Sequence, residues 1–173
     1  PSSACINAGA KHGNGFFPTA YSPIPILNPS TGLRNIRTRG GSEALSQRLA
    51  LSEKLSSFFS ARFPDPQVKS YREFYDNTLR LLRSKDLDSF DLNKESSAMR
   101  EKYGMGKFGQ GCLLARRLVE TGVRYVEVST DGWDMHNNLE SEMQDLSPAF
   151  DQAYAALISD LDDRGMLLSL IHI

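Results

Sequence analysis

The stretch from Val123 to Asn138, VRYVEVSTDGWDMHNN, constrains the fold of this 173-residue chain more than any other. An amphipathic helix predicted at about residues 110–120 ends at Thr121-Gly122, and the apolar run VRYVEV follows almost at once. A helix that leads through a tight turn into a buried strand is half of a strand–helix–strand crossover, the connection that parallel strands require. The sequence therefore predicts an α/β fold with a buried strand at about residues 123–128.

Most of the remaining pattern is helical. Apolar residues at three- and four-residue spacing predict helices over residues 42–62 and 67–83, which are expected to pack as an antiparallel hairpin. Tyr71, Phe74 and Tyr75 lie at helical spacing in the second of these helices and are expected to be core residues.

Two further helices are predicted downstream. Asn93 has the character of an N-cap for a short helix that ends at Tyr103, because Gly104 follows. Residues 139–164 predict either two helices or one helix kinked at Pro148, since a proline removes a backbone donor.

The chain is interpreted as one partial domain, residues 1–173, truncated at both ends. Residues 1–41 contain closely spaced prolines and many large apolar side chains, which predict an irregular ordered loop. Residues 42–167 are the helix-rich α/β part. The apolar residues at the C-terminus are suited to begin a second strand.

Composition and charge bear on the partners that the chain can have. The net charge of −1 gives no reason to expect nucleic acid as a partner, and no apolar run reaches the roughly 18 to 20 residues of a transmembrane segment. Cys5 and Cys112 are too few for a disulfide framework, and Cys112 is expected in the core. The sequence starts at Pro1, so the absence of a signal peptide leaves the localisation open.

Asp134 and His136 are the candidate functional residues, as a possible metal-ligand pair. In an extended loop, side chains two residues apart project to one side, roughly 6.5 to 7 Å apart along the chain. A modest curl would let a carboxylate oxygen and an imidazole nitrogen meet one divalent ion at roughly 2.0 to 2.2 Å. A third ligand must come from elsewhere in the protein. Asp131 and Glu127 could join the pair, but Glu127 lies inside the predicted strand and is expected to face a polar partner or an arginine. A structural alternative stays open, in which Asp134 caps a turn, His136 binds a carbonyl group and Trp133 fills the core.

Two other motifs favour structure over chemistry. GMGKFGQG, residues 104–111, lacks the Gly-Lys-Ser/Thr ending of a phosphate-binding loop and has no predicted strand before it, so it indicates a tight turn between helices. Ser129 lies near His136 in sequence, but no Gly-x-Ser-x-Gly motif accompanies it, so a serine hydrolase triad is not indicated.

The run CLLARRLVETGVRYVEVSTDGWDMHNNL resembles the bacterial family called domain of unknown function 1501. Its members typically show LLARRLVExGVRFVxV, then GGWDxH, then an amphipathic helix whose ending is similar to LISDLDDRGM at residues 157–166. DLNKESSAMREKYGMGKFGQG, GFFPTAY and PILNP also fit this family. Asp131 stands where members usually have glycine. The final LSLIHI, residues 168–173, departs from the family pattern, looks like sequencing-adapter read-through, and is expected to be a non-native tail.

The resemblance implies a fold like that of the alkaline phosphatase and sulfatase superfamily, and a metal-dependent phosphate- or sulfate-ester hydrolase. Asp134 and His136 would then ligate a divalent metal ion, and Gly132 and Trp133 would be supporting packing residues. The substrate would be a small-molecule or polysaccharide ester. The nucleophile would lie outside residues 1–173, so this polypeptide alone is expected to be inactive. The alternative is a non-catalytic exported binding or assembly protein that keeps the fold, and export to the periplasm is expected from the family in either case.

Overall fold

A computed structural model describes residues 3–7, 15–16, 21–34, 36 and 41–167 of the chain. The possible C-terminal strand, the tail at 168–173 and His12 lie outside these residues. In chain order the described elements are β1 (Ser3–Ile6), β2 (Ile24–Ile26), η2 (Pro29–Thr31), α1 (Gly41–Arg62), α2 (Pro66–Arg83), η3 (Lys85–Phe90), η4 (Leu92–Lys94), α3 (Ser97–Lys102), α4 (Lys107–Glu120), β3 (Tyr125–Val128) and α5 (Leu139–Asp163), where η marks a 3-10 helix.

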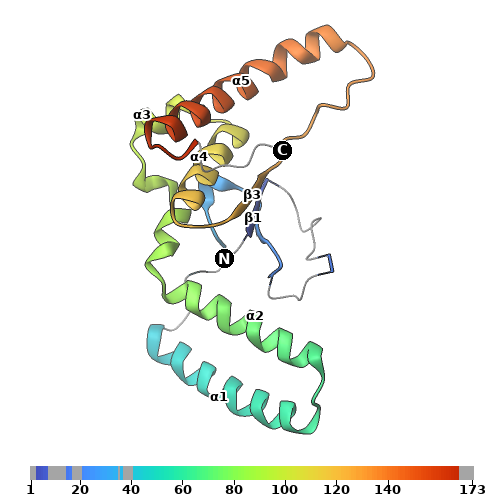
Figure 1. Ribbon diagram of the computed structural model, residues 1–173, viewed down its shortest axis with the longest axis vertical. Coiled ribbons are helices and arrows are strands. Elements are labelled where there is room, and N and C mark those ends of the chain that lie inside the picture. The colour runs from blue at the N-terminus through green and yellow to red at the C-terminus, as the bar shows by residue number, and fades with distance from the viewer. Residues whose placement is uncertain (1–2, 8–14, 17–20, 35, 37–40, 168–173) are drawn as a thin grey trace.

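The three described strands form one parallel sheet in the order β2-β1-β3 (Figure 1). β1 pairs with β3 from Ser3 opposite Tyr125 to Ile6 opposite Val128, and with β2 on its other side. A parallel sheet combined with many helices confirms the predicted α/β class. The prediction of an irregular loop over residues 1–41 is wrong where β1 and β2 lie.

The sheet and α4 make the centre of the core. Alternate residues of each strand point to the same side of the sheet. On the side that faces α4, these are Ala4 and Ile6 of β1 and Val126 and Val128 of β3, and all four belong to the hydrophobic core. Gly111 allows this close approach, because a Cβ atom there would lie only 3.0 Å from Val128 Cγ1. α5 packs on α4, and its Ala153 is fully buried. The buried strand predicted at 123–128 begins as a strand only at Tyr125, and β3 is half-exposed because it lies at the edge of the described sheet.

One helix cap needs correction, and one open alternative is decided. The short third helix is capped by Ser96 and not by Asn93, since Ser96 Oγ accepts a hydrogen bond of 3.1 Å from the amide of Met99. α5 is a single helix that contains Pro148, so of the two alternatives for residues 139–164 the single helix is the one that forms. The loss of one backbone donor at a proline is tolerated in this long helix.

The predicted hairpin of α1 and α2 forms and lies at the opposite end of the molecule from α5 (Figure 1). Asp65 caps α2 by accepting a hydrogen bond from the amide of Gln67. The expected core position of Tyr71, Phe74 and Tyr75 is wrong, because all three side chains are exposed. Their helical spacing does place them on α2 as predicted, but no described part of the chain covers them. None of the described helices combines the length and the hydrophobicity of a membrane span.

Candidate functional site

The loop that carries the candidate residues starts at the carboxyl end of the parallel sheet. The amide of Ser129 donates a 3.0 Å hydrogen bond to Ile6 O, which extends the pairing of β3 with β1 by one residue. From there the chain runs out to the far end of α5 (Figure 1). Ligands of parallel α/β sheets usually bind outside the carboxyl ends of the strands, so the loop lies on the expected side of the sheet.

Gly132 and Trp133 fasten this loop to α5. Gly132 has φ +94°, a conformation that other residues rarely adopt, and a Cβ atom there would lie 3.3 Å from Leu146 Cδ1. The Trp133 ring meets Phe150 edge to face with 5.5 Å between centroids. Phe150 in turn stacks on Phe108 and on the ring of a neighbouring tyrosine. Trp133 is 39% exposed, so it packs against α5 without being the core residue of the structural alternative.

Gly132→Ala is expected to lower the free energy of unfolding by about 1 to 2 kcal/mol through backbone strain, and to displace the loop. Trp133 is the chain's one tryptophan, so its fluorescence reports on the loop directly. We expect a red-shifted emission in the folded variant. Gly122→Ala is the matched control, because Gly122 has φ +92° but no atom within 4 Å of its Cβ position. It should cost similar stability and leave the emission unchanged; equal emission in both variants would contradict the assignment.

Asp134 and His136 meet each other at the outer part of the loop. His136 Nε2 lies 3.0 Å from Asp134 Oδ1, and the two side chains are 77% and 91% exposed. Two donor atoms bound at 90° to 110° to one ion, at roughly 2.0 to 2.2 Å each, stand roughly 3 Å apart. The pair therefore has a spacing that suits two ligands of one divalent ion, which is also the distance of a direct ion pair between the two side chains. Its role as a metal-ligand pair stays a prediction.

The other acidic residues considered as third ligands do not join the pair. Within the described residues, no group of three His, Cys, Asp or Glu side chains is arranged to hold an ion. Asp131 is exposed in the same loop. Glu127 lies within β3, where its carboxylate accepts hydrogen bonds of 3.4 Å from Tyr125 and Ser129. Glu127 is thus engaged along the strand and not with His136.

Asn7 is a polar residue at this edge of the sheet that the sequence did not single out. It follows β1 with φ +62°, and its Nδ2 donates a 3.1 Å hydrogen bond to Lys107 O at the start of α4. Its Oδ1 is buried and has no hydrogen-bond partner within the described part of the chain. Asn7 could have been found only by predicting β1, because Asn7 is the first residue beyond the carboxyl end of the strand Ser3–Ile6.

The two cysteines are not suited to be nucleophiles. Burial, with a smaller contribution from the charge of Glu127, raises the pKa of the Cys5 thiol. Burial raises the pKa of Cys112 to about 12, and Cys112 lies in the core as predicted. A thiol must ionise to act as a nucleophile, so both side chains are inert at neutral pH.

Comparison with known proteins supports one assignment. Neither the curated proteins nor the solved structures contain a chain that matches this one significantly. The profile of one family, described as a protein of unknown function (DUF1501), matches residues 1–170. That match spans the sheet, every described helix and the Asp134–His136 loop. The chain therefore belongs to the DUF1501 family.

Proposed function

We propose that the loop after β3 supplies two ligands, Asp134 and His136, to a divalent metal ion in a phosphate- or sulfate-ester hydrolase. The observation that carries the proposal is the 3.0 Å separation of His136 Nε2 and Asp134 Oδ1 in an exposed loop. Carboxylate and imidazole together suit Zn²⁺ and related transition ions. In the alkaline phosphatase-like fold that the family resemblance implies, Asp134 and His136 would hold the ion, which would supply Lewis-acid polarisation of the ester oxygen and stabilise the charge that develops on it.

The residues of this chain would orient the ion more than they would enclose it. The edge-to-face contact of Trp133 with Phe150 and the left-handed turn at Gly132 fix the part of the loop just before Asp134. A ligand pair on a fastened loop loses less conformational entropy when it binds an ion. A substrate ester, of a small molecule or of a polysaccharide, would approach from the open side, where both ligands are exposed.

Titration of the longer protein that the family resemblance implies, with Zn²⁺ and with Mn²⁺, tests the ligand assignment, because the described residues supply two ligands and an ion needs at least a third. Calorimetry should detect binding to the parent protein, and the affinity should fall at least about tenfold in Asp134→Ala and in His136→Ala. Asp131→Ala removes an equal charge from the same loop and should bind like the parent. Equal affinities in all four proteins, or no binding to the parent protein, would sink the assignment.

Hydrolysis itself is tested in the longer protein that the family resemblance implies. With the ion present, p-nitrophenyl phosphate or p-nitrophenyl sulfate should be cleaved, and His136→Ala should lower kcat/KM at least about 100-fold. Metal binding without turnover of either ester would favour a second function, that of a non-catalytic binding or assembly protein. One observation already favours this second function, namely the large exposed apolar surface of α1 and α2.

A further inference from the structure

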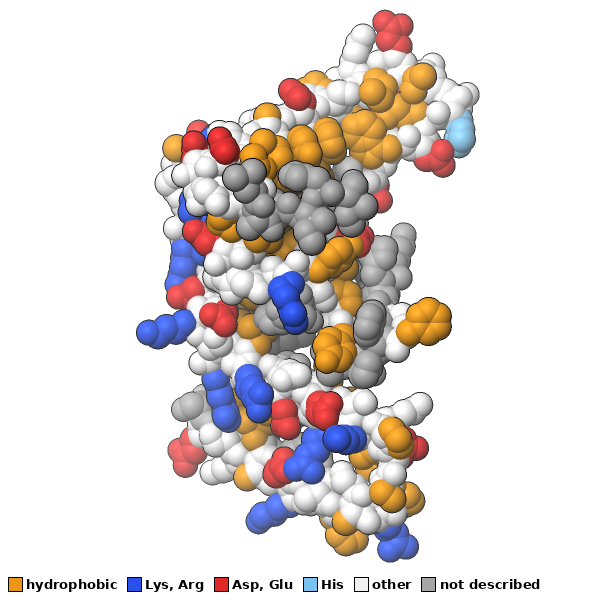
Figure 2. Space-filling view, in the orientation of Figure 1, with side chains coloured by type: hydrophobic (Ala, Val, Ile, Leu, Met, Phe, Trp, Pro, Cys, Tyr) orange, Lys and Arg blue, Asp and Glu red, His pale blue; other side chains and the backbone are white. Residues whose placement is uncertain are grey.

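The hairpin of α1 and α2 carries its large apolar side chains on the outside. Six aromatic and two leucine side chains of the hairpin are 38% to 73% exposed. We call them the hairpin surface: Leu51, Leu55, Phe58, Phe59, Phe63, Tyr71, Phe74 and Tyr75. No described side chain of either helix is buried. Figure 2 shows hydrophobic side chains gathered at this end of the molecule.

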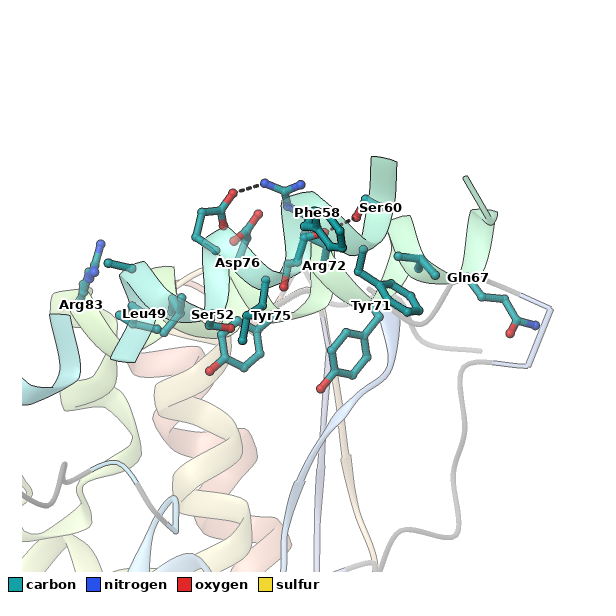
Figure 3. A pocket seen from close by; sticks show the side chains of 17 residues that line it. Leu49, Ser52, Phe58, Ser60, Gln67, Tyr71, Arg72, Tyr75, Asp76 and Arg83 are labelled. Atoms are coloured by element: carbon teal, nitrogen blue, oxygen red, sulfur yellow. Dashed lines mark hydrogen bonds and ion pairs between the residues drawn. The ribbon is translucent and has the colours of Figure 1, made fainter. Parts of the chain in front are cut away.

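The contact between the two helices explains why these side chains point outward. From residue 50 to the end of α1, the half-buried positions are Ser52, Ser56 and Ser60. Their four-residue spacing places them on one face of α1. Small polar residues thus occupy the inward positions in the second half of α1. Half-buried apolar positions of the hairpin include Leu45 and Leu49 on α1 and Val68, Leu79 and Leu82 on α2, which leaves the larger aromatic side chains outside. Figure 3 shows Tyr71 and Tyr75 projecting from the same side of α2. Both line a groove between the two helices, whose volume is about 1140 Å³.

The exposed area is of the size that a stable protein interface buries. A fully exposed aromatic side chain offers about 200 Å², so the six aromatic residues together expose roughly 600 Å². The two leucines bring the hairpin surface close to the ~800 Å² per partner of a standard interface. Five members of the hairpin surface line the same groove, namely Leu55, Phe58, Phe59, Tyr71 and Tyr75. A contiguous exposed apolar patch of this kind marks an interaction site.

The charges beside the hairpin surface are of both signs, so they suit a partner whose charges are also mixed. Seven basic side chains and four acidic ones are interspersed along the two helices: Arg48, Lys54, Arg62, Lys69, Arg72, Arg80 and Arg83, with Glu43, Glu53, Glu73 and Asp76. The hairpin surface itself carries no charged side chain, whereas binding to anionic lipids or nucleic acids depends on dense positive charge. A mixed surface can instead match a second mixed surface, as Arg72 already pairs with Glu53 across the hairpin.

We propose that the hairpin surface is the interface between two copies of this chain. Two antiparallel hairpins related by a two-fold axis would form a four-helix bundle, whose core consists of the side chains now exposed on each copy. Such an interface is closed, since each copy offers the same patch to the other. The Asp134–His136 loop lies outside it, so dimerisation is independent of the proposed metal site.

Light scattering after size-exclusion chromatography tests the proposal on the 173-residue chain. The parent chain should elute as a dimer, of about twice 19.3 kDa, at micromolar concentration. Phe58→Ser combined with Tyr71→Ser should weaken dimerisation at least about tenfold and yield the monomer. Both side chains are exposed, so the fold of the monomer should survive, and circular dichroism checks it.

Leu139→Ser is the matched control, because Leu139 on α5 is 60% exposed, as much as Leu51 on the hairpin. This variant should remain a dimer. A parent chain that stays monomeric throughout would overturn the proposal and indicate that another protein, or another segment of this chain, covers the hairpin surface. A dimer that persists in the double variant would also overturn it, as would a mass that keeps growing with concentration.

Discussion

Replacing Arg116 with methionine is expected to lower the free energy of unfolding by about 3 kcal/mol, because it removes one charged partner from the buried carboxylate of Asp160. Arg116 lies on α4 and is 2% exposed. Its Nε stands 2.9 Å from Asp160 Oδ2 on α5, and its two terminal nitrogens stand 2.9 Å from Glu120 and Glu95. One guanidinium group therefore joins α4, α5 and the segment before α3.

Asp160 is the partner that would lose most. It is 3% exposed, and besides Arg116 it accepts hydrogen bonds of 2.9 Å from the Tyr103 hydroxyl and 2.8 Å from Arg164 Nε. Methionine has nearly the length of the arginine stem, so the variant keeps most of the packing and removes the charge. Glu95 would keep its ion pair with Arg117, which places the main cost at Asp160.

Chemical denaturation of Arg116→Met against Arg72→Met measures this cost. Arg72 also pairs with a glutamate, Glu53, but the two side chains are 39% and 57% exposed, and such pairs contribute less than about 1 kcal/mol. The two variants make the same chemical change in a buried and in an exposed ion pair. If Arg116→Met cost no more than Arg72→Met, the cluster would not hold the helices together.

The same cluster predicts how stability depends on pH. Burial alone would raise the pKa of Asp160, but hydrogen bonds from Arg164 and Tyr103 and the charge of Arg116 outweigh it and hold the pKa below its ordinary value. The pKa of Glu95 is likewise lowered, since its bonds to arginines outweigh its burial. A carboxylate whose pKa is lower in the folded state than in the unfolded state stabilises the fold. This contribution is fully present above about pH 4 and is lost as the pH falls further. The stability difference between the parent and Arg116→Met should therefore shrink below about pH 4.

The local signals of the sequence predicted the helices well. Thr121-Gly122 after Glu120 is an end signal that acts within one helical turn, and α4 ends there as predicted. Asp65, which caps α2, was not singled out from the sequence. β1 and β2 were missed because they have four and three residues, fewer than a periodic pattern needs to stand out. The pairing of β1 with β3 connects residues more than 100 positions apart, from Ser3 to Tyr125, and no local signal carries such a contact.

Burial was harder to predict than helix formation. Tyr71 and Tyr75 have the spacing of an apolar helix face. This spacing is the same whether the face packs inside the chain or against another chain. The candidate site shows a similar division. The two-residue spacing of Asp134 and His136 was enough to predict that they could meet, and they do meet. Asn7 was out of reach, because its place at the sheet edge follows from the undetected strand before it.

Gly109→Ala is expected to destabilise the protein by about 3 kcal/mol, although alanine is the better helix former by up to about 1 kcal/mol. Gly109 lies in the first turn of α4 and is buried. A Cβ atom there would stand 2.1 Å from Tyr103 O and 2.5 Å from Gly104 O. Both contacts are with backbone atoms, so no side chain can rotate away, and the start of α4 must separate from the turn after α3.

That separation has a cost because the turn is held on several sides. The buried amide of Gln110 donates hydrogen bonds to Arg100 O and Gly104 O, at 3.0 and 2.9 Å. Tyr103 is fully buried and binds Asp160, so shifting its carbonyl would also strain the ion cluster.

Gly106→Ala is the matched control, since no atom lies within 4 Å of its Cβ position, and as an N-cap change it should cost less than about 1 kcal/mol. Denaturant unfolding of the two variants compares them directly. Gly109 and Gly106 stand three residues apart in one glycine-rich turn. A difference of about 2 kcal/mol between the unfolding free energies of the two variants would measure the steric contact at Gly109. Equal stability would show that α4 can move away from the turn freely.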